Sequence, residues 1–69
     1  MYKRIRDLRE DEDLTQKQVA EILHMQKTTY TRYESGEREL PFNIAILLAK
    51  QYDVSLDYIA GLTDKKHTL

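Results

Sequence analysis

The fold is decided by residues 14–36, whose sequence is LTQKQVAEILHMQKTTYTRYESG. Thr15 and Gln18 form a capping box, in which each side chain bonds a backbone N–H left free at a helix start. The apolar side of this helix is Val19, Ala20, Ile22 and Leu23, and His24 then ends it. Gly36 suits the end of a second helix, because glycine adopts the left-handed conformation freely. The stretch therefore predicts two short helices joined by a tight turn, the second over about residues 27–34.

This arrangement holds one helix on a core and turns the other outward, where it can enter a DNA major groove. The stretch resembles the helix-turn-helix of the Cro/cI-repressor type, the XRE family, at Leu14, Thr15, Gln16, Val19, Ala20, Leu23, Tyr30, Tyr33, Glu34 and Gly36. With its flanks the resemblance covers nearly the whole chain and implies an all-α, five-helix lambda-repressor-like domain. It also favours a helix over Thr28–Thr31, whose residue types alone suggest a strand. His24 departs from the family, since many members have glycine there.

The flanking segments predict three further helices. The first runs from about residue 2 to 12, with Ile5 and Leu8 on its apolar stripe. Pro41 opens a helix over 42–52, which is so apolar that we expect it to be the central core element. Ser55 caps a short last helix that ends at Gly61. We predict one DNA-binding domain over residues 1–62, with its helix-turn-helix at about 15–34, and a polar tail at 63–69.

Composition excludes several classes of protein. The 69 residues form one domain near the lower size limit for a single core. There is no cysteine and only His24 and His67, so we predict neither a metal site nor a cofactor. No apolar run approaches the length of a membrane span and no signal peptide is discernible, so we expect a cytoplasmic protein with no membrane partner. No Ser/His/Asp set, paired-carboxylate pocket or phosphate-binding glycine loop is recognisable, which argues against an enzyme.

Helical geometry divides residues 27–34 into two sides. With Lys27 at zero, Thr31, Thr28 and Arg32 fall at about 40°, 100° and 140°, while Thr29, Tyr33 and Tyr30 fall at about 200°, 240° and 300°. We expect the tyrosine side to pack on the core, the alternative being that the tyrosines stack on bases. Arg can bind guanine bidentately and a Thr methyl can contact thymine. The candidate base-reading residues are therefore Lys27, Thr28, Thr31 and Arg32, the alternative being an ordinary solvated face.

Contacts to phosphate are expected beside this face, at Gln16, Lys17, Gln26 and Arg38. Gln16 and Gln26 lie at helix starts, where side-chain amides and exposed backbone N–H groups can bind phosphate, and the resemblance implies the same role. The overall charge disagrees, because eleven Lys and Arg against twelve Asp and Glu give −1. Glu37 and Glu39 also lie where such repressors commonly carry Lys or Arg. These acids would repel the DNA backbone, so we expect two copies to bind together.

Glu34 needs a compensating charge, because it lies at the end of a helix, where the dipole is negative. The resemblance implies Arg9 as its partner in a structural ion pair between two helices. The alternative is a solvated Glu34, since most surface pairs contribute little.

The resemblance implies sequence-specific binding of double-stranded operator DNA by a bacterial or phage transcriptional regulator, as a homodimer. The small core and the apolar residues that continue past Gly61 make Tyr58, Ile59 and Leu62 candidates for the dimer interface. The alternative is an antitoxin or adaptor whose main ligand is another protein, with DNA binding secondary.

Overall fold

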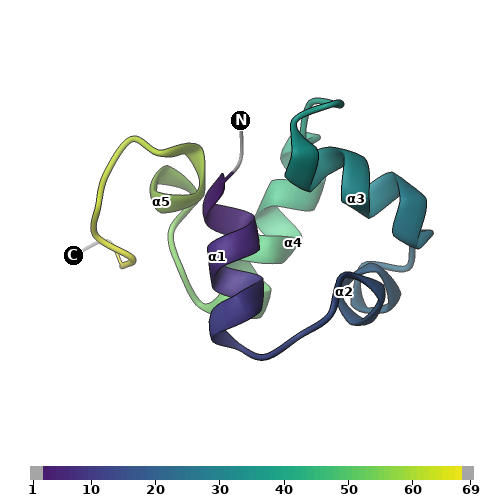
Figure 1. The fold of residues 1–69 in the computed structure, drawn as a ribbon. Coiled ribbons are helices and arrows are strands. Elements are labelled where there is room, and N and C mark those ends of the chain that lie inside the picture. The colour runs from purple at the N-terminus through teal and green to yellow at the C-terminus, as the bar shows by residue number, and fades with distance from the viewer. Residues whose placement is uncertain (1–2, 68–69) are drawn as a thin grey trace.

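The computed structural model describes residues 3–67, which form five α-helices and no strand within that range (Figure 1). The helices are α1 (Lys3–Asp11), α2 (Gln16–Ile22), α3 (Lys27–Ser35), α4 (Phe42–Tyr52) and α5 (Leu56–Ala60). The predicted all-α fold is confirmed, and Thr28–Thr31 lies inside α3. The expected helix start at Tyr2 lies outside the described residues.

Local signals hold the helix-turn-helix in place. The predicted capping box is present: Thr15 N donates to Gln18 Oε1 at 2.8 Å, and Gln18 N donates to Thr15 Oγ1 at 3.1 Å. His24 turns the chain after α2 with a φ of 57°, which residues other than glycine adopt infrequently. Gly36 ends α3 with a φ of 83°, as predicted for a C-terminal cap. Both helices of the motif therefore begin and end for reasons that are local in the sequence.

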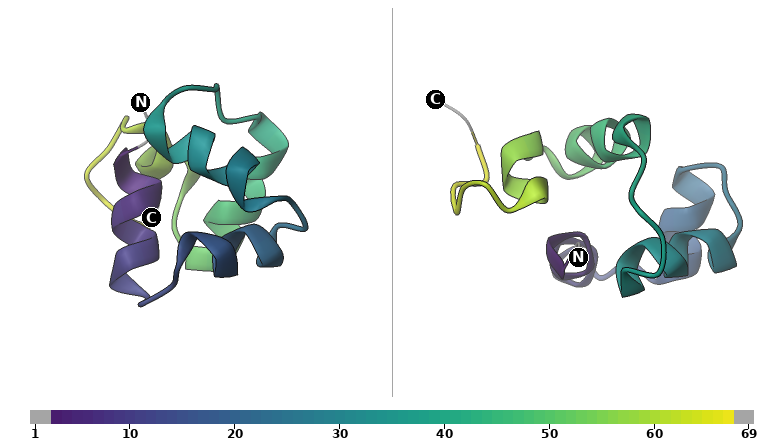
Figure 2. Two further views of the ribbon diagram at one scale, coloured as in Figure 1. Left: turned by 45° about the vertical axis from the view of Figure 1, so that its right-hand side comes forward. Right: turned by 90° about the horizontal axis from the view of Figure 1, so that it is seen from above.

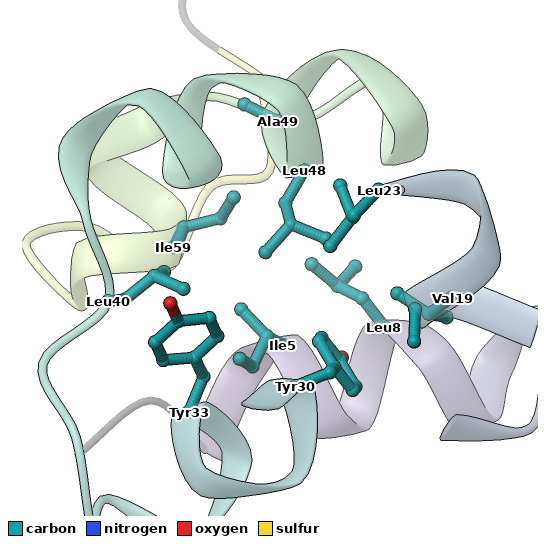
Figure 3. Packing of buried hydrophobic residues seen from close by; sticks show 11 residues of the cluster. Ile5, Leu8, Val19, Leu23, Tyr30, Tyr33, Leu40, Leu48, Ala49 and Ile59 are labelled. Carbon is teal, nitrogen blue, oxygen red and sulfur yellow. The ribbon is translucent and has the colours of Figure 1, made fainter. Parts of the chain in front are cut away.

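One apolar core lies between the helices, and all five contribute to it (Figure 3). Its buried members are Ile5, Leu8, Val19, Ala20, Leu23, Tyr30, Tyr33, Leu40, Leu48, Ala49 and Ile59. Tyr30 and Tyr33 project from α3 into this core, so the side of α3 predicted to be internal is internal. The ring that each tyrosine buries fixes the rotation of α3 about its own axis.

The expectation that α4 is the central core element holds for one side of the helix only. Leu48 and Ala49 are its buried residues, whereas Phe42 is 73% exposed and Leu47 is also exposed. A domain of this size has no further layer that would cover the outer side of α4. The helix therefore carries more apolar surface than the core uses.

The segment after α5 is attached to α1 rather than free. Seen from above, α1 lies between this segment on one side and the helix-turn-helix on the other (Figure 2). The Arg4 guanidinium donates to the carbonyl oxygens of Tyr58 and Thr63, pairs with Asp64, and lies 4.3 Å from the centre of the Tyr58 ring. Ser55 N also donates to Lys66 O at 2.7 Å. The polar tail is thus mostly exposed, as expected, but anchored, with residues 68 and 69 outside the described range.

A buried tyrosine hydroxyl makes the stability of the domain sensitive to alkaline pH. Tyr52 Oη is buried without a hydrogen-bond partner among residues 3–67, and burial, followed by the Glu34 carboxylate, raises the pKa of Tyr52 to about 12. This pKa exceeds the value of 10.0 expected in the unfolded chain, so keeping the Tyr52 hydroxyl protonated favours the folded state. The free energy of unfolding is therefore unaffected by the ionisation of Tyr52 below pH 10 and falls as pH rises towards 12.

Tyr52→Phe should therefore be neutral or stabilising by up to about 1 kcal/mol at neutral pH, since it removes an unsatisfied buried group. Its advantage over the wild type should grow as pH rises from about 10 towards 12, measured by urea unfolding. The two proteins losing stability in parallel over this range would show that Tyr52 does not carry the effect.

Candidate nucleic-acid interface

The two sides of α3 differ in burial as the helical spacing predicted. Tyr30 and Tyr33 are buried, whereas Lys27, Thr28 and Arg32 are exposed. These three side chains therefore form the outward face of α3. Thr31, the fourth candidate base-reading residue, is half-buried at the edge of this face.

The predicted Arg9–Glu34 ion pair is present and ties α1 to α3. Arg9 Nε lies 2.7 Å from Glu34 Oε2, Arg9 Nη2 donates to Glu34 Oε1 at 3.2 Å, and Arg9 Nη1 donates to Leu14 O at 2.9 Å. The side chains of Arg9 and Glu34 are only 12% and 4% exposed. Burial alone raises the pKa of the Glu34 carboxyl, but the hydrogen bonds from Arg9 and Gln16 outweigh burial and the pKa lies below its ordinary value. Both oxygens of the Glu34 carboxylate thus accept charge-assisted hydrogen bonds from the Arg9 guanidinium.

Gln16 extends this contact into a network that reaches the outward face. Its Nε2 donates to Glu34 Oε1 at 3.1 Å, and Thr31 Oγ1 donates to its Oε1 at 3.0 Å. The Gln16 amide is therefore engaged within the protein, and so is the Thr31 hydroxyl proton. For a contact to DNA this leaves the second N–H of the Gln16 amide, the Thr31 methyl group and the second lone pairs of the two oxygens.

A hollow of about 320 Å³ lies over the network and is lined by Arg6, Arg9, Gln16, Thr31, Glu34 and Ser35. Arg6 was not among the predicted site residues. It is exposed, and its Nε lies 3.4 Å from Glu10 Oε2 on the same helix. Its sequence position, on the polar side of α1, gave no sign that α1 would bring it beside Gln16 and Thr31.

The remaining candidate phosphate contacts surround the outward face. Lys17 in the first turn of α2, Gln26 and Arg38 are all exposed. Gln26 is the residue that precedes α3, and its side chain makes no capping hydrogen bond. Its amide is thus not used in holding the helix start.

The loop after α3 brings an acid onto the outward face. Glu37 Oε2 lies 3.2 Å from Arg32 Nε, and both side chains are exposed. The sequence predicted that Glu37 would repel DNA, but it did not predict that Glu37 would pair with a candidate base-reading residue.

Comparison with known proteins identifies the family. A model described as helix-turn-helix matches residues 5–59, which is most of the chain. The chain belongs to the helix-turn-helix family. The predicted resemblance is confirmed, and the family is a DNA-binding rather than an enzymatic one, in agreement with the expectation that the chain is not an enzyme.

The helix-turn-helix domain is similar to three transcriptional regulators of Bacillus subtilis (strain 168). YobD is 45% identical over 65 residues, covering 93% of this chain and 58% of that protein. YqaE is 36% identical over 55 residues, covering 80% and 47%, and AnsR is 31% identical over 65 residues, covering 94% and 56%. The chain therefore spans about half the length of these relatives. No solved structure matches it.

Two further observations concern a membrane span and the candidate dimer residues. No helix in the range 3–67 is long and apolar enough to cross a membrane. Of the candidate dimer residues, Ile59 is only 3% exposed and belongs to the core, so its assignment to an interface is corrected: the monomer already buries it. Tyr58 is half-buried beneath Arg4, and Leu62 is 78% exposed.

Proposed function

We propose that this domain binds double-stranded operator DNA in a sequence-specific manner, as the DNA-binding part of a bacterial transcriptional regulator acting in the cytoplasm. The observation that carries this proposal is the division of α3. Tyr30 and Tyr33 lock one side into the core, and Lys27, Thr28 and Arg32 stand outward on the other. An exposed helix with a fixed rotation presents the same side chains to every duplex, which reading a sequence requires.

The outward face supplies the chemistry that base recognition needs in the major groove. Arg32 can donate two hydrogen bonds to guanine O6 and N7, and Thr28, one turn earlier, can contact a thymine methyl. Lys27, at the first turn, is suited to a base edge or a phosphate. Thr31 is placed to offer its methyl group, because its hydroxyl donates to Gln16.

Contacts to phosphate would hold α3 in its groove. We assign them to Lys17, Gln26, Lys27 and Arg38, with Arg6 as an addition from the hollow beside Gln16. Gln16 also supports Thr31 and Glu34 through its hydrogen bonds, and the second N–H of its amide remains for a phosphate, so it stays among the proposed phosphate contacts.

We further propose that the domain binds as a homodimer, through Leu62, Tyr58 and the adjoining surface of α4 and α5. There a groove of about 190 Å³ is lined by Leu40, Phe42, Ala45, Leu56, Ile59 and Ala60. Phe42 and Leu62 are exposed apolar side chains of the kind that a self-complementary interface covers. A twofold dimer would place its half-sites about 34 Å apart. Sedimentation showing a monomer both alone at high concentration and on DNA would rule the dimer out.

The dependence of binding on salt should be moderate. Lys17, Lys27 and Arg38 give two or three phosphate contacts per subunit, and Arg6 is left out of this count because it already pairs with Glu10. A dimer would therefore neutralise roughly four to six phosphates, for a log–log slope of about −4 to −5. The slope is measured by titrating the best duplex at several salt concentrations. A slope near zero would contradict a complex anchored on phosphates.

Selection of bound duplexes from a random library tests the proposed function as a whole. Recovery of an enriched sequence, with half-sites one turn apart, is the expected result. The second candidate, an antitoxin or adaptor that binds another protein, is favoured by the exposed Phe42 groove. It predicts no enrichment, and binding of duplexes that a polyanion competitor removes completely.

A further inference from the structure

An ion pair joins Arg32, on the outward face of α3, to Glu37, in the loop after α3. Arg32 Nε is 3.2 Å from Glu37 Oε2. Arg32 is the residue best suited to recognise guanine, and Glu37 introduces a negative charge next to it. A regulator that needed only affinity for DNA would gain from a neutral or basic residue at position 37.

Several hydrogen bonds in the loop place the backbone of Glu37 close to Arg32. The carbonyl oxygen of Arg32 accepts from Ser35 Oγ at 3.1 Å and from Arg38 N at 3.2 Å. Glu37 N donates to Ser35 Oγ at 3.3 Å, and Gly36 turns the chain in the left-handed conformation. The loop therefore folds back over the end of α3, and the carboxylate reaches Arg32 because the backbone brings it there.

The chemistry of the guanidinium explains what the pair can do. Arginine carries five N–H donors in a rigid plane, and guanine uses only two of them. The Glu37 carboxylate lies 3.2 Å from Nε, on one edge of the guanidinium, and this leaves the donors on the terminal nitrogens for a base. The negative charge of Glu37 also weakens the attraction of Arg32 for phosphate, because that attraction depends mainly on net charge. The hydrogen bonds of Arg32 to guanine O6 and N7 depend more on direction, so the carboxylate weakens them less.

We propose that Glu37 is a positioning residue that sets the specificity of Arg32, by orienting its guanidinium and by suppressing its binding to phosphate. This inference rests on the proposed function, since it assumes that Arg32 meets a base. Specificity is a difference between two affinities, and Glu37 acts mainly by weakening the unwanted one. The acidic loop thereby has a role consistent with DNA binding rather than opposed to it.

The test compares wild type with Glu37→Gln on the best selected duplex, on a scrambled duplex and on all single-pair variants of the site. Glu37→Gln should bind the scrambled duplex about 3–10-fold more tightly, because one negative charge per subunit is removed close to the backbone. The ratio of specific to scrambled affinity should fall by about 5–10-fold, with the preference relaxed at the base pair that Arg32 reads. Thermal melts confirm that both proteins are folded.

Two matched variants separate positioning from a general charge effect. Glu39→Gln makes the same change of charge in the same loop, two residues away, and should not relax preference at that base pair. In an Arg32→Ala background, Glu37→Gln should leave every base preference unchanged, because the residue it positions is absent. Equal relaxation by Glu37→Gln and Glu39→Gln, or an unchanged preference profile in Glu37→Gln, would overturn the inference. Failure of the wild type to select any duplex would instead overturn the proposed function.

Discussion

Glu34→Ala is expected to destabilise the domain by about 3–5 kcal/mol, because it leaves the guanidinium of Arg9 largely buried without its counter-charge. Glu34 accepts from Arg9 at two oxygens and from Gln16 at one, and its side chain is 4% exposed. The variant thus removes a charge, three hydrogen bonds and the link between α1, α2 and α3. For a small domain this is a large part of the total stability.

Urea unfolding of the wild type and four variants measures the effect and its origin. Glu37→Ala is the matched control, since its carboxylate also pairs with an arginine but is exposed, and it should change stability by no more than about 0.5 kcal/mol. Arg9→Ala and the Arg9→Ala/Glu34→Ala double variant complete a cycle whose coupling should lie at about 0.5–3 kcal/mol. Equal small effects of Glu34→Ala and Glu37→Ala would show that Arg9 and Glu34 are not coupled.

Features that depend on neighbouring residues were predictable from the sequence. The capping box at Thr15 and Gln18, the left-handed Gly36 and the two sides of α3 follow from spacings of three or four residues. The Arg9–Glu34 pair joins residues 25 apart, and only the family resemblance supplied it.

Features that depend on how distant segments meet were not predictable. No spacing rule brings Gln16 between Glu34 and Thr31. Nor does one bring Arg4 onto a carbonyl oxygen of α5, at Tyr58, and another after it, at Thr63. The apolar pattern of α4 did not reveal that one side would lack a covering layer. Ile59 was a candidate interface residue because the core is small and apolar residues continue past Gly61, yet α5 turns it into the core.

Arg32→Ala is expected to weaken binding to the selected operator by about 1–3 kcal/mol and to relax the preference at one G·C pair. Arg32 and Thr28 lie one helical turn apart on the outward face, so both should reach base edges in the same groove. Changes at Thr28 should alter the preference at a neighbouring pair with a smaller effect on affinity. Lys17→Ala should instead weaken all duplexes alike and reduce the salt slope by about one unit for each phosphate that is no longer neutralised.

The Arg32–Glu37 pair determines which variants the test of Arg32 requires. Removing Arg32 abolishes its contact to a base, but it also leaves the Glu37 carboxylate facing the DNA. This unpaired negative charge would weaken binding to every sequence. The Arg32→Ala/Glu37→Gln double variant is therefore also compared with the wild type, because it removes one positive and one negative charge and keeps the net charge of the face. All proteins are compared at one salt concentration after melts confirm folding, because a destabilised domain would mimic weak binding. If this double variant binds operator and scrambled duplex less tightly than the wild type by the same factor, Arg32 contacts phosphate, and the outward face of α3 does not read bases through it.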